Sequence, residues 1–299
     1  MLSSKLLLAA CASLFTAAAL VQDQASETWS LQTAGGDVGI IVNPTGGNVA
    51  VLRNDAGSLI VDSNYKRFRK EYTEAFKSFA GDSPRFMINT HWHGDHTGNN
   101  DMLREQGALI VSHAAVRARL AGDAGVEGRT GQDIPAAALA EVTFDEQMGL
   151  NLGGERIEIR HYGPGHTDGD GVVWFKTSKV VHMGDLFFNG GFPFIDLGAG
   201  GDVRGYVAVV GEVLAELEEA GSEWRVIPGH GAICGADDLR AFHEMLEDCV
   251  ARVEEALAAG DGVEQMLEVD ILAGYESWAA GFINTKRMVE TLATGLDAK

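Results

Sequence analysis

The chain has 299 residues, of which 45% are hydrophobic and 8% aromatic, so its composition fits a globular protein with a substantial core and excludes a disordered chain. Its 43 acidic and 23 basic residues give a formal net charge of -20, which disfavours nucleic acid and anionic membrane surfaces as partners. A small-molecule substrate is compatible with this charge, and the sequence leaves the oligomeric state open.

The N-terminal segment has the pattern of a signal peptide over residues 1–20, with Lys5, an apolar stretch and three alanines before a cleavage site near Leu20. The stretch is shorter than the about 20 apolar residues of a membrane span, so we expect export to the periplasm or beyond rather than a stable membrane span. The residues before Cys11 also match the pattern that precedes a lipid-modified cysteine in lipoproteins, so a lipoprotein anchored through Cys11 is the alternative to a freely exported protein. The mature chain, residues 21–299, is expected to be one domain with a helical extension from about residue 236.

The first half of the mature chain predicts strands followed by helices. Runs of β-prone residues between turn residues predict antiparallel strands at residues 38–42, 48–52 and 58–62. Helical spacing and short apolar runs then predict a helix over 65–80, strands at 85–89 and 108–111, and helices at 99–106 and 112–121. The Gly-rich residues 122–135 are expected to form a surface loop, a lid or a plain connector.

The second half repeats this order. Strands are expected between residues 141 and 181, and helices over 203–220 and 236–259, with a less regular remainder. Because each sheet needs an apolar partner on both faces, two strand-rich halves with helices outside predict a four-layer αββα sandwich of the α/β (α+β) class.

The motif most relevant to chemistry directly follows the expected strand at residues 85–89. It reads N-T-H-W-H-G-D-H-T-G and places four side chains able to bind a metal in one tight turn, namely His91, His93, Asp95 and His96. Three further candidates, His166, Asp185 and His230, each lie just past a predicted strand at a Gly-marked loop, where α/β architectures gather their ligand sites. Imidazole and carboxylate together suit zinc, iron or manganese.

The order H-x-H-x-D-H followed by single His, Asp and His residues resembles the signature of the metallo-β-lactamase superfamily, and the resemblance extends from the early strands to Gly231. It implies two metal ions per chain, with zinc expected and iron or manganese as alternatives. By this resemblance the first ion is held by His91, His93 and His166, the second by Asp95, His96 and His230, and Asp185 bridges both.

Two such ions would lower the pKa of a water between them toward about 7 and polarise a carbonyl, so a metal-bound hydroxide could attack the substrate. We therefore expect a binuclear metal-dependent hydrolase of a small ester, thioester, lactone or amide, with Asp95 as the catalytic residue that orients the nucleophile or transfers its proton. An iron-dependent thiol or persulfide oxygenase on the same fold, and β-lactamase activity, are the alternatives.

Asp185 separates branches of the family. By the resemblance, the best-known zinc β-lactamases have Cys at this position or lack the bridging acid, whereas glyoxalase II-type thioesterases, lactonases and many phosphodiesterases use Asp. Two features differ from glyoxalase II itself: Trp92 interrupts its usual run of histidines, and the C-terminal helices are acidic rather than basic.

Substrate contacts are expected from loops around the metal motif. The candidates are Trp92, inside that motif, and Phe187, Phe188, Phe192 and Phe194, which follow Asp185. The alternative is that about half of these phenylalanines pack in the hydrophobic core and do not contact the substrate. The early loop at residues 43–47 is a further candidate, and no Lys or Arg is placed by the sequence alone, so the charge of the substrate stays open.

The remaining histidines and cysteines do not fit the signature. His113, His161, His182 and His243 are expected to have structural roles, with His161 and His182 as candidate partners of the ligands. Cys234 and Cys249 are expected to be unpaired, buried thiols, because a helix over residues 237–258 would separate them by about 18 Å.

Overall fold

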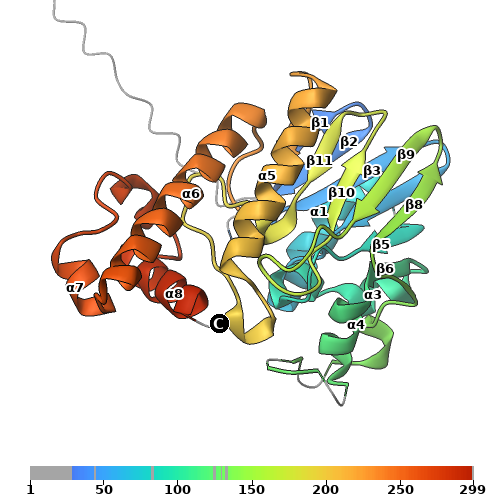
Figure 1. The fold of residues 1–299 in the computed structure, drawn as a ribbon. Coiled ribbons are helices and arrows are strands. Elements are labelled where there is room, and N and C mark those ends of the chain that lie inside the picture. Colours follow the sequence, from blue (N-terminus) through green and yellow to red (C-terminus); the bar gives the residue numbers. More distant parts are fainter. Residues whose placement is uncertain are drawn as a thin grey trace, which may run out of the picture.

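The computed structural model describes residues 29–43, 45–81, 84–123, 126–128, 130–131 and 134–297, so the expected signal peptide and Cys11 lie outside the described residues. Among the described residues, a pair of β-sheets pack against each other, and helices cover their outer faces (Figure 1). The predicted αββα order of layers is therefore confirmed.

The first sheet has seven strands in sequence order. A meander of four antiparallel strands comes first, formed by β1 (Ser30–Gly35), β2 (Val38–Val42), β3 (Val49–Asn54) and β4 (Gly57–Val61). Three parallel strands follow, β5 (Phe86–Ile88), β6 (Leu109–His113) and β7 (Val142–Phe144). β4 and β5 are also parallel and pair Val61 with Ile88, so the residues just past both strands meet at one edge of the sheet.

The second sheet has five strands in the order β12-β11-β10-β9-β8. These are β8 (Gln147–Leu152), β9 (Glu155–Arg160), β10 (Val172–Phe175), β11 (Val180–His182) and β12 (Arg225–Ile227). β11 and β12 are parallel and pair His182 with Ile227, which brings the loops after these two strands side by side. An isolated bridge between Phe188 and His230 extends that contact.

The α-helices among the described residues are α1 (Arg69–Ala80), α2 (Gly94–Thr97), α3 (Asn100–Glu105), α4 (Ala114–Ala121), α5 (Val203–Ala220), α6 (Ala236–Ala259), α7 (Val263–Glu268) and α8 (Thr285–Asp297). α6, α7 and α8 lie together at one side of the sandwich, next to α5 (Figure 1).

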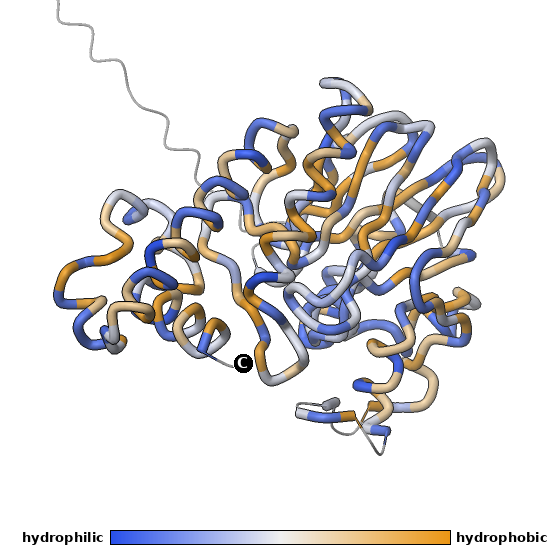
Figure 2. The backbone as a smooth tube through the Cα atoms, in the orientation of Figure 1, coloured by the Kyte–Doolittle hydropathy of each residue, from blue (hydrophilic) through white to orange (hydrophobic). Residues whose placement is uncertain are grey.

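Three buried apolar clusters correspond to the three interfaces between the four layers. Between the sheets, Leu52 and Val61 pack with Ile159 and Phe175. On the outer face of the first sheet, α1 and α3 pack on the strands, and on the outer face of the second sheet α5, α6 and α8 bury a larger cluster around Trp174. Hydrophobic segments accordingly follow the strands and the inward helix faces in Figure 2. Burial at about 25 cal/mol per Å² of apolar surface drives this layering.

Several boundaries differ from the sequence-based expectation. β6 extends to His113 and α4 begins at Ala114, because the His113 side chain caps α4 by accepting a hydrogen bond from the Ala115 backbone N–H. A 3-10 helix, Lys66–Phe68, precedes α1. The segment after residue 259 is more regular than the sequence predicts, since it contains α7 and α8.

Cys234 and Cys249 are buried and unpaired with each other, as predicted, and burial raises the pKa of each thiol to about 12. None of the helices in the described residues is both long and apolar enough to cross a bilayer.

Candidate metal centre

The seven predicted ligand residues converge from four separate segments at one edge of the sandwich. The loop after β5 and the short helix α2 carry His91, His93, Asp95 and His96. His166 lies in the loop between β9 and β10, Asp185 in the 3-10 helix Gly184–Leu186 after β11, and His230 in the loop after β12. Their possible ligand atoms form two groups, in each of which all atoms lie within 4.8 Å of one another.

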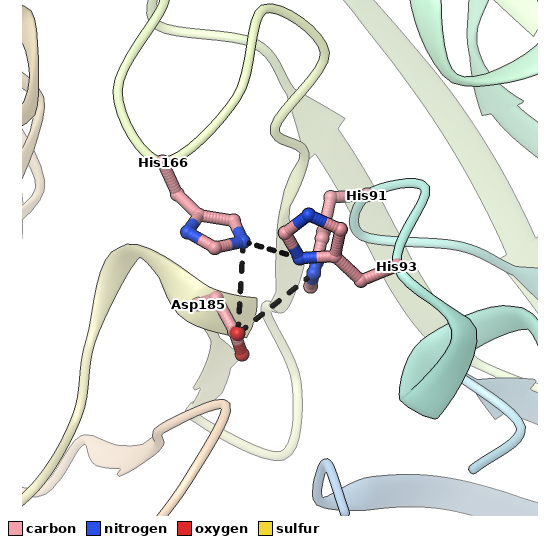
Figure 3. A group of neighbouring side chains, drawn as sticks. All are labelled: His91, His93, His166 and Asp185. Carbon is pink, nitrogen blue, oxygen red and sulfur yellow. Dashed lines mark hydrogen bonds and ion pairs between the residues drawn. The ribbon is translucent and has the colours of Figure 1, made fainter. Parts of the chain in front are cut away.

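The first group contains His91, His93, His166 and Asp185, whose side chains point toward one another in Figure 3. His93 Nδ1 lies 2.9 Å from His166 Nε2. Asp185 Oδ2 lies 3.6 Å from His166 Nε2 and 3.8 Å from His91 Nε2. These separations place three imidazole nitrogens and one carboxylate oxygen around a single point.

The second group contains Asp95, His96 and His230. Asp95 Oδ2 lies 3.3 Å from His230 Nε2 and 3.6 Å from His96 Nε2. The other oxygen of Asp185, Oδ1, lies 3.1 Å from His96 Nε2 and 3.4 Å from His230 Nε2. The two oxygens of Asp185 therefore face different groups, which is the placement expected of a residue between two cations.

The donor set fits divalent metal ions. His91 Nε2 is buried and forms no hydrogen bond within the described stretches of the chain, although it points into a cluster of other ligand atoms. A buried polar atom left in this way costs about 1–3 kcal/mol unless something else binds it. Three histidine nitrogens beside a shared carboxylate match the ligands that zinc and iron take in proteins.

Each imidazole ring of His93 and His166 forms a hydrogen bond on the side facing away from the first group, and this bond determines which ring nitrogen faces the other ligand atoms. His93 Nε2 lies 2.9 Å from Asp196 Oδ2, so Nε2 carries the proton and Nδ1 faces the centre. His166 Nδ1 lies 2.6 Å from the Phe194 carbonyl oxygen, so Nδ1 donates and Nε2 faces the centre. Such outer contacts fix the tautomer and the orientation of a ligand ring.

A single buried carboxylate, Asp62, supports one histidine of each group. Its Oδ2 lies 2.7 Å from His96 Nδ1, and the same oxygen accepts a hydrogen bond from Thr90 Oγ1 at 2.7 Å. Thr90 Oγ1 in turn lies 3.0 Å from His91 Nδ1 and, since its own proton is donated to Asp62, accepts a hydrogen bond from that nitrogen. Asp62 and Thr90 are neighbours because they follow the paired parallel strands β4 and β5. Asp62 also has a φ of 66°, a strained backbone conformation for a non-glycine residue.

The electrostatics differ between the two groups. Burial lowers the pKa of His91 well below its ordinary value and lowers the pKa of His166 to about 4, so both rings are neutral and ready to bind a metal. Burial also acts against charge on His230, but the carboxylates of Asp185 and Asp95 outweigh it and raise the His230 pKa to about 9. Burial likewise acts to lower the pKa of His96, but the carboxylates of Asp185, Asp95 and Asp62 outweigh it and raise that pKa well above its ordinary value. A metal ion that binds at the second group would therefore have to displace the protons on His230 and His96.

Glycine is required where the loops approach the ligands most closely. A Cβ atom at position 229 would lie 2.0 Å from Asp185 Oδ1, and one at position 47 would lie 2.3 Å from the His96 ring. Both separations are far shorter than van der Waals contact, so Gly229 and Gly47 allow the backbone to press against the candidate ligands.

A cavity of about 900 Å³ adjoins both groups. Asp95, His230, Asp185 and His93 line it, so a ligand in the cavity reaches both groups. The early loop at residues 43–47, a further candidate for substrate contact, contributes Asn43, Thr45 and Gly46 to the wall. The volume suits a small molecule rather than a polymer.

The predicted aromatic contacts divide into two sets. Phe188, Phe192 and Phe194 line the cavity. Phe187 does not; it is fully buried against Phe242, with 5.0 Å between ring centroids. Trp92 is also absent from the lining and packs with Val116, Leu120 and Ala199. Phe187 and Trp92, which the sequence also offers as substrate contacts, therefore do not line this cavity: Phe187 lies in an apolar core, and the Trp92 ring lies beside the His93 ring, with 5.1 Å between centroids.

The four other histidines lie outside both groups. His113 stacks on His161 with 4.2 Å between centroids, and His161 Nδ1 lies 2.8 Å from the Asp170 carbonyl. His182 Nδ1 accepts a hydrogen bond from the Gly184 backbone and so shapes the turn that carries Asp185. His243 Nε2 lies 3.2 Å from the Val207 carbonyl, between α6 and α5. Their contacts are structural.

Comparison with known proteins agrees with this geometry. Metallo-beta-lactamase type 2 from Bacillus cereus is 29% identical over 192 residues, which cover 62% of this chain and 67% of that protein. An acyl-coenzyme A thioesterase from Bos taurus is 26% identical over 217 residues, 64% of this chain and 75% of that protein. A solved metallo-beta-lactamase from Pontibacter korlensis shares the fold with a TM-score of 0.60 and 18% identity, covering 74% of this chain and all of that chain. The family model described as the metallo-beta-lactamase superfamily matches residues 42–235, and the chain belongs to that superfamily.

Proposed function

We propose that the protein is a metal-dependent hydrolase that cleaves a small ester, thioester, lactone or amide, using two divalent ions, zinc in the first instance. The observation that carries this proposal is the convergence of seven His and Asp side chains, in two groups that share Asp185, at the base of a small-molecule cavity. When bound, such ions supply a hydroxide nucleophile near neutral pH and polarise a scissile carbonyl.

The ligand residues are proposed to divide as the two groups do. His91, His93 and His166 would hold one ion, Asp95, His96 and His230 the other, and Asp185 would contact both through its separate oxygens. Asp62 and Asp196 then keep His96 and His93 in the tautomers that bind. The chain's own contribution is thus a preorganised set of ligand atoms, whose lone pairs already face the sites at which the metal ions would bind.

Asp95 is proposed as the catalytic carboxylate. It lines the cavity, and its Oδ2 contacts both histidines of the second group at 3.3 and 3.6 Å. Burial acts to raise its pKa, but His96 and His230 outweigh burial and lower that pKa, so the group is ionised at neutral pH. An ionised carboxylate at the cavity wall can orient an attacking water and accept its proton.

β-Lactam hydrolysis is the second candidate, and it is supported by the sequence matches to type 2 metallo-beta-lactamases. A β-lactam is a cyclic amide, so its cleavage would use the same donor groups. The acyl-coenzyme A thioesterase match supports thioester hydrolysis in the same way. The identity to these relatives stays below 30%, which does not discriminate between the two substrates, so an activity assay has to identify the substrate.

The test is a hydrolysis panel with an ester, a thioester, a lactone and a β-lactam, run on the zinc-loaded protein, the chelated protein and the Asp95→Asn variant. We expect at least one substrate to be cleaved, with the rate lost on chelation and restored by zinc. Absence of cleavage across the panel by a protein that retains its metal would contradict a hydrolase function. Export from the cytoplasm is also proposed, on the N-terminal sequence pattern.

A further inference from the structure

One basic side chain enters the wall of the cavity from the C-terminal end of the chain. Arg287, in the first turn of α8, lines the cavity together with Gly281 and Phe282. Among the described residues that line the cavity it is the sole Lys or Arg, whereas the acids, Asp95 and Asp185, belong to the candidate metal centre. All three C-terminal residues lie beyond residue 235, where the family match ends.

Two aromatic rings hold the guanidinium group. The Arg287 Cζ atom lies 4.7 Å from the Phe282 ring centroid and 5.3 Å from the Phe194 ring centroid. Among the described residues no carboxylate forms an ion pair with it, so its hydrogen-bond donors are not committed to an internal acid. Cation–π contacts orient a guanidinium without using its N–H groups, which leaves these free for a ligand.

Phe194 connects this arginine to the metal centre. Its ring lies 5.8 Å from the His93 ring, nearly parallel to it, and 5.8 Å from the His166 ring. The same ring therefore contacts the first ligand group and Arg287, so one benzene ring separates the two. A ligand that reaches both needs only a short chain or a single ring between its reacting carbonyl and its anionic end.

The position of Arg287 is fixed by the fold rather than by a mobile loop. Asn284 Oδ1 accepts a hydrogen bond from the Arg287 backbone N–H at 2.9 Å and caps α8, while the following residues Met288 and Val289 are fully buried. The Phe192 backbone N–H also donates to the Trp278 carbonyl at 2.8 Å, which ties the aromatic loop to the C-terminal segment. A cation in the first turn of a helix is disfavoured by the helix dipole, so helix stability does not explain this residue.

The exposure of Phe282 and Arg287 at the rim of the cavity also indicates a ligand-binding role. The Phe282 side chain is 72% exposed although it borders a cavity, and Arg287 beside it is exposed too. An aromatic ring and a cation at the mouth of the cavity would both be covered by a bound molecule that carries an apolar body and a negative charge.

We propose that Arg287 selects substrates with a carboxylate, which it binds at the cavity rim while the scissile carbonyl lies at the metal centre about one ring away. This inference rests on the proposed hydrolase function and names the class of its substrate: a short acyl compound with a free acid at the end opposite the cleaved bond. Phe282 and Phe194 hold the guanidinium in place and contact the apolar segment of that compound.

The test compares Arg287→Gln with Lys286→Gln, which removes the same charge from the neighbouring exposed position, where Lys286 contacts Glu290. Two readouts are used on the zinc-loaded proteins. The first is kcat/KM for the 4-nitrophenyl monoester of glutaric acid and for 4-nitrophenyl pentanoate, its uncharged match in chain length. The second, which needs no turnover, is calorimetric binding of 3-phenylpropanoate and of its uncharged amide.

Arg287→Gln should lower kcat/KM for the glutarate ester and the affinity for 3-phenylpropanoate by about tenfold each, and leave the uncharged compounds within about twofold. Lys286→Gln should leave all four values within about twofold. Equal losses for charged and uncharged compounds, no loss in Arg287→Gln, or no binding of 3-phenylpropanoate would overturn the inference. Arginine-dependent binding without cleavage of either ester would instead count against the hydrolase function alone.

Discussion

The Oδ2 atom of Asp62 lies 2.7 Å from His96 Nδ1, and both side chains are completely buried. Through Thr90 the same carboxylate also supports His91, so one residue outside the ligand set holds a histidine of each group. Asp196 has a more local role, since its carboxylate contacts the ring of His93, which belongs to the first group. This difference leads to the first prediction.

Asp62→Asn should weaken both metal sites, because an amide cannot accept all three hydrogen bonds that Asp62 accepts, from the Thr90 backbone N–H, Thr90 Oγ1 and His96 Nδ1, so the tautomers of His91 and His96 are released. The expected loss is roughly 10- to 100-fold in affinity at each site. Asp196→Asn should weaken one site only. Competition titration with a zinc chelator measures both, with the exposed Asp37→Asn as a control that should match the wild type. If Asp62→Asn weakened zinc binding at one site only, as Asp196→Asn is expected to do, the shared role of Asp62 would be contradicted.

Asp95→Asn should lower kcat more than its effect on metal binding explains. Asn keeps an oxygen that can contact the second group but cannot accept a proton, so general-base catalysis worth about 10²–10⁴-fold is lost. The rate is measured at zinc concentrations that saturate the variant, with metal content determined on the same sample. A variant with both metals and an unchanged kcat would remove Asp95 from the chemistry.

Metal affinity at the second group should rise with pH. The pKa of His230 is about 9 in the metal-free protein, above its ordinary value, so at neutral pH a proton occupies the ring and a metal must displace it. The protonated form is lost as pH rises through about 9, so affinity should increase up to about tenfold per pH unit below that value and then level off. Calorimetry in buffers of different ionisation enthalpy should detect a released proton at pH 7. A flat affinity between pH 7 and about 9 would contradict this.

Gly229→Ala should disturb the centre, because its Cβ would lie 2.0 Å from Asp185 Oδ1. We expect a loss of about 1–3 kcal/mol in the free energy of unfolding, together with weaker metal binding. Gly149→Ala, in β8, is the matched control, since its Cβ meets no atom within 4 Å. Chemical denaturation gives the stabilities. If both variants were equally stable and bound metal equally, the close approach would have no energetic role.

The sequence predicted the layers and the seven converging side chains because both depend on local pattern. Alternating apolar runs form the strands, and each expected ligand follows a strand or lies in the loop that one leads into. The supporting residues depend on which strand ends meet. Asp62 ends the predicted run S-L-I-V-D and could have been found by the same strand-end rule, but its contact with His96 requires β4 to pair in parallel with β5.

Other features could not be predicted from spacing. Trp92 lies within the metal motif, yet its side chain packs with Val116 and Leu120 beside the His93 ring and does not line the cavity, because neighbouring loop residues can face different directions. Arg287 is about 100 residues from Asp185 in the chain and reaches the cavity only because α8 packs against α6 and α5. Packing between distant helices is not encoded in a local pattern.

Metal analysis of the purified protein tests the central claim most directly. Elemental analysis of the wild type, His230→Ala and His91→Ala, each after zinc loading and removal of free metal, should give about two zinc ions in the wild type and about one in each variant, since each substitution removes a ligand from a different group. One ion in the wild type that persists in His230→Ala, or a single bound iron in place of zinc, would contradict the two-ion centre.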